Sequence, residues 1–145
     1  MCSLDNSRFR LIKRLSPGPY VFILKTLLGT EKALDIRRRE AGVRIPGHLI
    51  PLALINALQH PLYSITAKKS MHEDIEFEST AEAETDLPPI PEEDLFEGGW
   101  ELDGIEGVDM VLDGGEERER VFSTILDLSG EDIRLLRRGA GPWPV

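Results

Sequence analysis

The chain has 145 residues, of which 41% are hydrophobic and 30% are charged, and its formal net charge is −9. This composition is too apolar for a disordered chain and is sufficient for one hydrophobic core. The single cysteine, Cys2, excludes an intrachain disulfide and a cysteine-rich zinc site. The longest apolar run, residues 49–55, is too short to span a bilayer, and the first residues do not resemble a signal peptide. We therefore expect a cytoplasmic protein with no membrane partner.

The charges are divided unevenly along the chain. Residues 1–69 contain twelve Lys and Arg and four Asp and Glu, whereas residues 70–119 contain one basic residue and nineteen acidic ones. The basic portion could attract phosphates, and the acidic portion could cover it or repel nucleic acid. The alternative is that most of these charges are solvated surface, as charged side chains usually are.

The first half of the chain predicts alternating helices and strands. In order, the patterns predict a helix capped by Ser3 or Asp5 and ended by Pro17, a buried strand at 20–24, a helix at 31–40, a strand at 42–46, an apolar helix from residue 47 or 48 to residue 58, and a strand at 62–66. The apolar face of the first helix is expected to consist of Phe9, Leu11, Ile12 and Leu15. This alternation is typical of a mixed α/β protein.

The second half begins with an acidic, proline-rich stretch. Residues of about 72–90 are expected to form a mobile insertion, because like charges repel and prolines disfavour regular structure. A short helix at 91–94 and strands at 108–112, 121–128 and 133–136 follow, with a turn at 113–115. The predicted fold is therefore α/β (α+β), a twisted mixed β-sheet with helices packed on it, in a single domain of residues 1–145.

Residue spacing alone identifies little chemistry. The sequence contains neither a P-loop nor a G-x-S-x-G nucleophile motif. Arg44 lies in a predicted apolar strand, where a buried arginine needs a partner, which is either a carboxylate or a bound anion. The hydroxyls of Thr66 and Ser123 lie in strand-like runs, where they could donate to a ligand or satisfy backbone groups nearby.

Six short motifs, in order, resemble those of the threonylcarbamoyl-adenylate synthase (YrdC/YciO-like) family, and they are nearest to its YciO branch. The motifs are PGPYVFIL at 17–24, VRIP at 43–46, PLYSITAK at 61–68, VLDGG at 111–115, STILD at 123–127 and RRG at 137–139. The resemblance begins at about residue 5.

This resemblance implies a fold, an activity and a site. The fold is a twisted mixed sheet with helices and a basic groove. The activity condenses L-threonine, bicarbonate and ATP into threonylcarbamoyl-adenylate, which serves the modification of adenosine 37 in tRNA, and double-stranded RNA is a further implied partner. Mg²⁺ can accompany ATP, and no metal held by the protein itself is predicted. The nucleotide- and substrate-binding residues implied by the resemblance are Arg44, Thr66, Lys68, Ser123 and Arg137.

The sequence also departs from the family pattern. Val21 and Lys68 stand where the motifs have threonine and asparagine, and Thr66 stands where they have serine. The family's N-terminal motifs have no counterpart, so the chain is expected to correspond to the C-terminal part of the domain. We therefore expect a protein that binds nucleotide or RNA in a basic groove and is catalytically impaired in this short form. The alternative is a non-enzymatic RNA- or protein-interaction module with an acidic regulatory insertion.

Overall fold

The computed structural model forms two compact units, which are described separately. The described residues are 2–27, 39–72, 90–113 and 121–143. Unit 1 contains those within 1–62 and 121–145, and unit 2 contains those within 63–83 and 88–120. That the whole chain is one family domain stays a prediction, and the expected acidic insertion lies outside the described residues except at its two ends.

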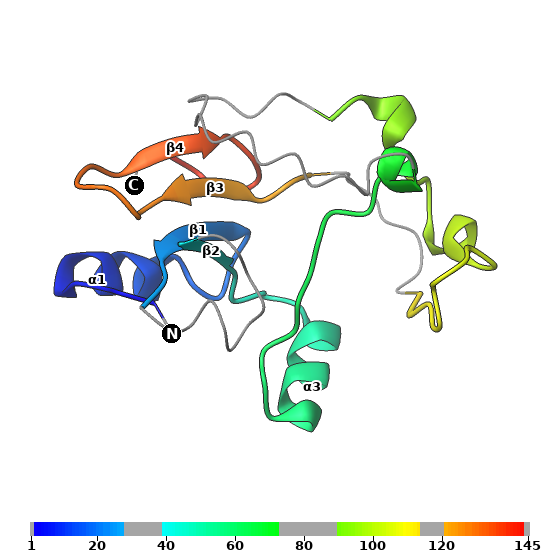
Figure 1. Ribbon diagram of the computed structural model, residues 1–145, viewed down its shortest axis with the longest axis horizontal. Helices are drawn as coiled ribbons and strands as arrows, with labels where there is room; N and C mark the ends of the chain where they lie inside the picture. The colour runs from blue at the N-terminus through cyan, green and yellow to red at the C-terminus, as the bar shows by residue number, and fades with distance from the viewer. Residues whose placement is uncertain (1, 28–38, 73–89, 114–120, 144–145) are drawn as a thin grey trace. The chain divides into compact units, whose positions relative to one another are not determined.

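Unit 1 is built around a four-stranded mixed sheet (Figure 1). Its strands are β1 (Tyr20–Lys25), β2 (Glu40–Val43), β3 (Thr124–Asp127) and β4 (Arg134–Arg137). The order is β2-β1-β3-β4, with β1 parallel to β3 and both outer pairs antiparallel. Tyr20 lies opposite Thr124 and Ile23 lies opposite Asp127, so the sheet joins the two ends of the sequence.

The two central strands are buried for reasons visible in their sequences. In β1 the side chains of Tyr20, Phe22 and Leu24 are buried, and the residues between them are half-buried. This period of two is expected when one face of a strand meets the core. All four residues of β3 are buried, as is typical of a central strand covered on both faces.

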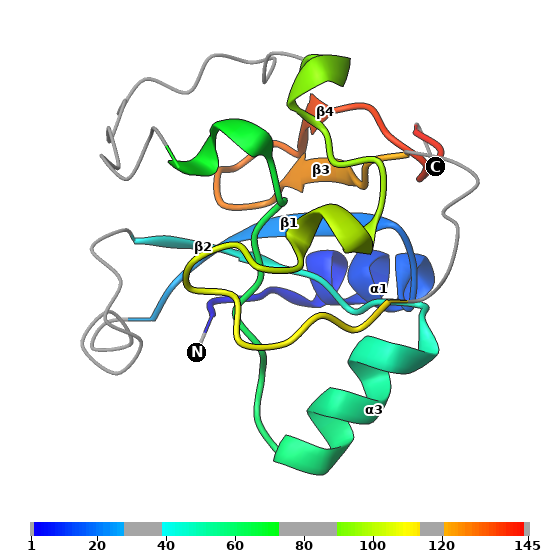
Figure 2. The same ribbon diagram turned by 90° about the vertical axis from the view of Figure 1, so that its right-hand side faces the viewer.

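Helix α1 (Asn6–Leu15) packs against this sheet and completes the core (Figure 2). The Asp5 carboxylate caps it, because one of its oxygens accepts hydrogen bonds from the backbone N–H groups of residues 7 and 8, each at 2.8 Å. Leu15 is buried, and Leu11 and Ile12 pack against the core. The prediction that Phe9 faces inward is wrong: it is 54% exposed, because position 9 lies about 200° around the helix from position 11, which packs against the core.

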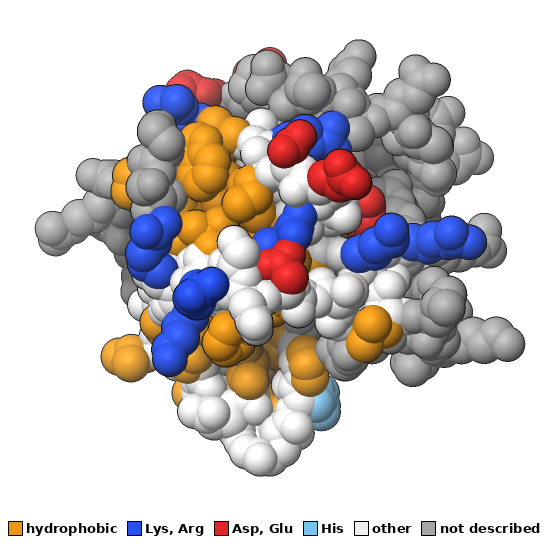
Figure 3. Space-filling view, turned by 90° about the vertical axis from the view of Figure 1, so that its left-hand side faces the viewer, with side chains coloured by type: hydrophobic (Ala, Val, Ile, Leu, Met, Phe, Trp, Pro, Cys, Tyr) orange, Lys and Arg blue, Asp and Glu red, His pale blue; other side chains and the backbone are white. Residues whose placement is uncertain are grey.

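Helix α3 (Leu49–Leu58) confirms the predicted apolar helix, although it buries none of its residues. His48 caps the first turn of the helix, because its ring Nδ1 accepts a hydrogen bond from the Ile50 backbone N–H. The residue that follows the last turn, Gln59, adopts a left-handed backbone conformation with φ of 57°. Leu49 is 83% exposed. Figure 3 shows hydrophobic side chains exposed in its lower part, at the height of α3 in Figure 1.

Within its described residues, unit 2 contains short 3₁₀ helices and no strand. They are η1 (Lys69–His72), η2 (Glu92–Asp94) and η3 (Gly99–Leu102). The Asp94 carboxylate accepts hydrogen bonds from the Ser70 backbone N–H at 2.6 Å and from its hydroxyl at 2.8 Å, which joins η1 to η2. Lys69 pairs with Glu101 at 3.0 Å and joins η1 to η3. Helix η2 confirms the predicted short helix at 91–94.

Several predicted elements differ from the structure. The expected strands at 62–66 and 108–112 do not form; Ile65 and Met110 in these segments are about three-quarters exposed and have no strand partner among the described residues. The strand expected at 42–46 lies at 40–43, so residue 40 belongs to β2 rather than to the end of a helix. The rest of the helix expected at 31–40, up to residue 38, lies outside the described residues, as does most of the expected turn at 113–115.

Candidate functional site

The five predicted site residues are divided between the two units. Arg44, Ser123 and Arg137 belong to unit 1, whereas Thr66 and Lys68 belong to unit 2. Within unit 1 the structure brings Ser123 and Arg137 into contact, because the residues just before β3 lie beside the end of the antiparallel strand β4.

Arg137 is the most firmly held of these residues. Its Nε donates a hydrogen bond to the Ser123 backbone carbonyl at 3.1 Å. The guanidinium carbon lies 5.1 Å from the centroid of the Phe122 ring, within the range of a cation–π interaction. Burial lowers the pKa of the Arg137 guanidinium. The group nevertheless stays charged near neutral pH, because arginine is not deprotonated in proteins.

The two terminal nitrogens of Arg137 have no hydrogen-bond partner among the described residues. Neither of these two nitrogens is fully buried, so they reach solvent. A guanidinium fixed at Nε and open at its terminal fork has the geometry that binds carboxylate or phosphate oxygens in pairs. Arg137 is therefore suited to hold an anion.

The chain after β4 forms the support of this arginine. The buried Thr124 hydroxyl accepts a hydrogen bond from the Gly139 backbone N–H at 3.0 Å and donates one to the Gly141 carbonyl at 2.6 Å. A Cβ atom at position 139 would overlap the Phe122 carbonyl, and one at position 141 would overlap the Tyr20 ring. Glycine is thus required at both positions for the close approach of this segment to the sheet.

Sequence reasoning did not identify this support. Thr124 resembled any other strand hydroxyl, and the role of the two glycines depends on contacts with distant parts of the chain. The available signal was the G-A-G spacing at 139–141 immediately after a strand, because isolated glycines there suggest close packing of the backbone.

Arg44 lies just after β2 and is exposed. The expectation that it lies inside an apolar strand is wrong, since β2 ends at Val43. Its guanidinium has no hydrogen bond or ion pair with another described residue. The argument that a buried charge requires a ligand therefore does not apply to Arg44, although an exposed arginine remains free to contact an anion.

The unit 2 residues lie in an irregular segment before η1. Thr66 is exposed and Lys68 is half-buried. Hydrogen bonds from Ser70 have the largest effect in lowering the pKa of Asp94, and the charges of Lys68 and Lys69 lower it further. The structure describes these side chains within unit 2 alone, so their role beside Arg137 stays a prediction.

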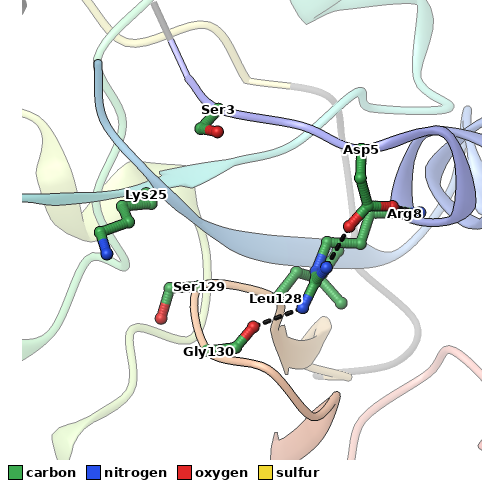
Figure 4. Close-up of a pocket in the computed structure, with 7 residues that line it drawn as sticks. All are labelled: Ser3, Asp5, Arg8, Lys25, Leu128, Ser129 and Gly130. Atoms are coloured by element: carbon green, nitrogen blue, oxygen red, sulfur yellow. Dashed lines mark hydrogen bonds and ion pairs between the residues drawn. The ribbon is translucent and has the colours of Figure 1, made fainter.

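A separate pocket of about 140 Å³ opens at the carboxyl ends of the parallel strands β1 and β3 (Figure 4). Its lining residues are Ser3, Asp5, Arg8, Lys25, Leu128, Ser129 and Gly130. Figure 4 shows the Arg8 guanidinium between Asp5 and Gly130, with a dashed line to each. The Arg8 guanidinium pairs with the Asp5 carboxylate and donates to the carbonyls of Gly130 and Glu131, the latter at 2.9 Å. Arg8 therefore ties α1 to the loop after β3.

The described residues contain no group of three or more His, Cys, Asp or Glu side chains that could hold a metal ion. Within the same residues, no helix is long and apolar enough to cross a membrane.

Comparison with known proteins identifies relatives over most of the chain. A family model for Sua5, YciO and YrdC, described as telomere recombination, matches residues 1–90. The Escherichia coli protein YciO is 31% identical over 139 residues, which are 95% of this chain and 58% of YciO. A Haemophilus influenzae protein is 30% identical over the same length. The chain thus spans less than two-thirds of the length of these relatives.

Solved structures share the fold at 24% sequence identity. The crystal structure of E. coli YciO matches with a TM-score of 0.63 over 97% of this chain and 60% of YciO. A P. abyssi Sua5 variant matches with a TM-score of 0.67, and P. abyssi Sua5 complexed with L-threonine matches with a TM-score of 0.65; these cover 95% and 94% of this chain but only 36% and 35% of theirs. The predicted mixed α/β fold is confirmed.

Proposed function

This chain belongs to the Sua5/YciO/YrdC family, and from that premise we propose that it binds the phosphates of ATP, and those of RNA, through Arg137 with Ser123 and Arg44. The observation that carries the proposal is the Arg137 guanidinium, fixed at Nε and stacked on Phe122, with its terminal nitrogens open to solvent. A preordered fork loses little conformational freedom when it binds, so it favours phosphate over water.

We further propose that the chain by itself is impaired as an L-threonylcarbamoyladenylate synthase. Val21 and Lys68 replace the threonine and asparagine of the family motifs. The chain also spans 58% of YciO, so the activity of the longer proteins is carried over only as a proposal. L-threonine and bicarbonate are the remaining proposed substrates, with Mg²⁺ accompanying ATP; the threonine complex of P. abyssi Sua5 supports threonine.

The experiment is a calorimetric titration of the purified chain with ATP. Arg137→Ala is expected to weaken ATP binding by about 10- to 150-fold, since a hydrogen bond to a charged group contributes about 1.5–3 kcal/mol. Arg137→Lys should restore part of the affinity, because it keeps the charge and loses the fork. The matched control is Arg138→Ala, which removes an exposed neighbouring charge and should change affinity by less than about twofold.

If the Arg137→Ala variant binds ATP as tightly as the unchanged chain does, the proposed phosphate site at Arg137 is refuted. The impairment is tested separately by pyrophosphate release in the presence of ATP, L-threonine and bicarbonate. Turnover near ~1 s⁻¹, a rate within the usual range for enzymes, would contradict it.

One observation favours a second candidate function. Residues 70–119 carry nineteen acidic side chains against one basic one, which suits a non-enzymatic interaction module whose acidic segment regulates binding. Under that alternative, the chain binds neither ATP nor threonine, and deletion of residues 72–90 changes only its affinity for RNA or a protein partner.

A further inference from the structure

The outward side of α1 carries a compact group of four exposed residues, which we call the α1 outer face: Phe9, Arg10, Lys13 and Arg14. Positions 9 and 13, and positions 10 and 14, are four apart, and positions 10 and 13 are three apart. Residues at these separations are neighbours on a helix surface, with Cβ atoms about 5–6 Å apart. The four side chains therefore form one continuous surface.

The three cations of this face form no ion pair among the described residues, although the Arg10 Nε donates a hydrogen bond to the Asn6 backbone carbonyl at 3.2 Å. Helix α1 contains no Asp or Glu, and the Asp5 carboxylate before it pairs with Arg8. None of the ion pairs formed by the described residues includes Arg10, Lys13 or Arg14. Like charges three or four residues apart repel one another and destabilise a helix, so an anion bound across them would relieve this repulsion.

Local structure explains only part of this arrangement. Lys13 and Arg14 lie in the last turn, where cations interact favourably with the helix dipole. That effect falls off within one turn, so it does not explain Arg10. It also does not explain Phe9, which is 54% exposed while the other apolar side chains of α1 pack against the core.

A nucleic-acid strand with unpaired bases fits both the cations and the exposed ring, because it offers phosphates and flat bases. We infer that the α1 outer face binds an unpaired stretch of RNA. Arg10, Lys13 and Arg14 neutralise successive phosphates, and Phe9 stacks on a base. Aromatic stacking and a cationic track are the two means by which proteins bind single strands. The inference rests on the part of the proposed function that names RNA, but it uses none of the residues proposed for ATP.

An anionic membrane fits this face less well. A helix that lies on a bilayer inserts a broad apolar face, whereas Leu11, Ile12 and Leu15 of α1 are packed against the core of unit 1. Phe9 alone remains exposed among the apolar residues of the helix. The surface therefore offers cations and one ring rather than an insertion face.

The test measures binding of a fluorescent single-stranded RNA of mixed, non-self-pairing sequence by anisotropy, from about 50 to about 200 mM salt. Phe9→Leu keeps an apolar side chain but removes the ring. It should weaken binding by roughly 5- to 150-fold, the range observed for loss of one stacked base, and leave the salt dependence unchanged. Binding of the fully paired duplex should not respond to this substitution.

The charge variant is Arg10→Gln with Arg14→Gln. Loss of two phosphate contacts should reduce the log–log salt slope by about 1.4, since each contact to a single strand contributes about 0.7. The matched control is Lys25→Gln with Arg39→Gln, which removes the same charge from two other exposed positions of unit 1. Circular dichroism should show unchanged folding for every variant, because all the substitutions are at the surface.

Three results would overturn the inference. The first is the absence of RNA binding by the unchanged chain. The second is an equal loss of slope in the two charge variants, which would indicate diffuse attraction. The third is binding to an anionic lipid vesicle that depends on Arg10 and Arg14, while binding to RNA does not depend on them. ATP titration of the same variants separates the two proposals: the α1 variants should bind ATP normally, whereas Arg137→Ala should lose ATP and keep the effect of Phe9→Leu on RNA.

Discussion

Replacement of Thr124 by valine tests how the segment after β4 is held in place. Thr124 is fully buried, and its hydroxyl both accepts from the Gly139 N–H at 3.0 Å and donates to the Gly141 carbonyl at 2.6 Å. Valine has nearly the same shape and favours a strand as strongly. The substitution therefore removes two hydrogen bonds and changes the packing very little.

The expected cost follows from the two backbone groups that lose their partner. A buried donor or acceptor left unsatisfied costs about 1–3 kcal/mol. Gly141 is buried and Gly139 is half-buried, so water can partly compensate the Gly139 N–H. We expect the free energy of unfolding to fall by about 2–4 kcal/mol in total. Thr124→Ser keeps the hydroxyl and loses one methyl group, which should cost only about 0.5–1.5 kcal/mol.

Urea denaturation followed by tryptophan fluorescence measures this difference, since Trp143 lies at the end of the segment and packs against the core. With a slope of about 2 kcal/mol per molar urea, the midpoint should fall by about 1–2 M for valine and by less than about 1 M for serine. A valine variant that unfolds at the same urea concentration as the unchanged chain would refute the reasoning, and so would a serine variant that is the less stable of the two.

Two further predictions concern stability. Phe22 is fully buried, so Phe22→Ala should lower the free energy of unfolding by about 3–5 kcal/mol, whereas Leu49→Ala, on the exposed side of α3, should change it by about 0.5 kcal/mol or less in the same denaturation assay. Burial would raise the pKa of Asp127, but hydrogen bonds from Ser129 and Arg134 outweigh it and hold the pKa below its ordinary 3.8. A carboxylate with a lowered pKa stabilises the fold at a pH above its ordinary pKa. This stabilisation is lost as the pH falls through the pKa of the folded state. Acid should therefore destabilise the unchanged chain more than Asp127→Asn between about pH 5 and pH 2, and equal acid sensitivity in the two would contradict the assignment.

Local sequence patterns predicted α1, β1 and α3 because each contains its own signals. Asp5 and Pro17 mark the limits of α1, and the apolar residues at 20–24 predict a strand without knowledge of its neighbours. The ordered motifs also predicted the family and the mixed fold, because each motif keeps its residues at fixed short spacings.

Patterns of the same kind failed where an element depends on a distant partner. Residues 62–66 and 108–112 are as apolar as true strands, but no strand pairs with them among the described residues. Strand formation requires hydrogen bonds from a neighbour, so local propensity alone cannot distinguish such segments from β3. The same limit applies to Arg44, which a plausible strand pattern placed inside the strand at 42–46, whereas β2 ends one residue before it, at Val43.

The candidate site shows the same division between local and distant information. The sequence by itself determined that Arg137 belongs to a motif and that cations gather in residues 1–69. Only the tertiary structure decided that Arg137 rests on Ser123 and Phe122, fourteen and fifteen residues away along the chain. It likewise decided that Phe9 faces away from the core. The reason is physical: charge and propensity are properties of a residue and its neighbours, whereas burial and hydrogen-bond partners arise when parallel strands β1 and β3 bring the two ends of the chain together.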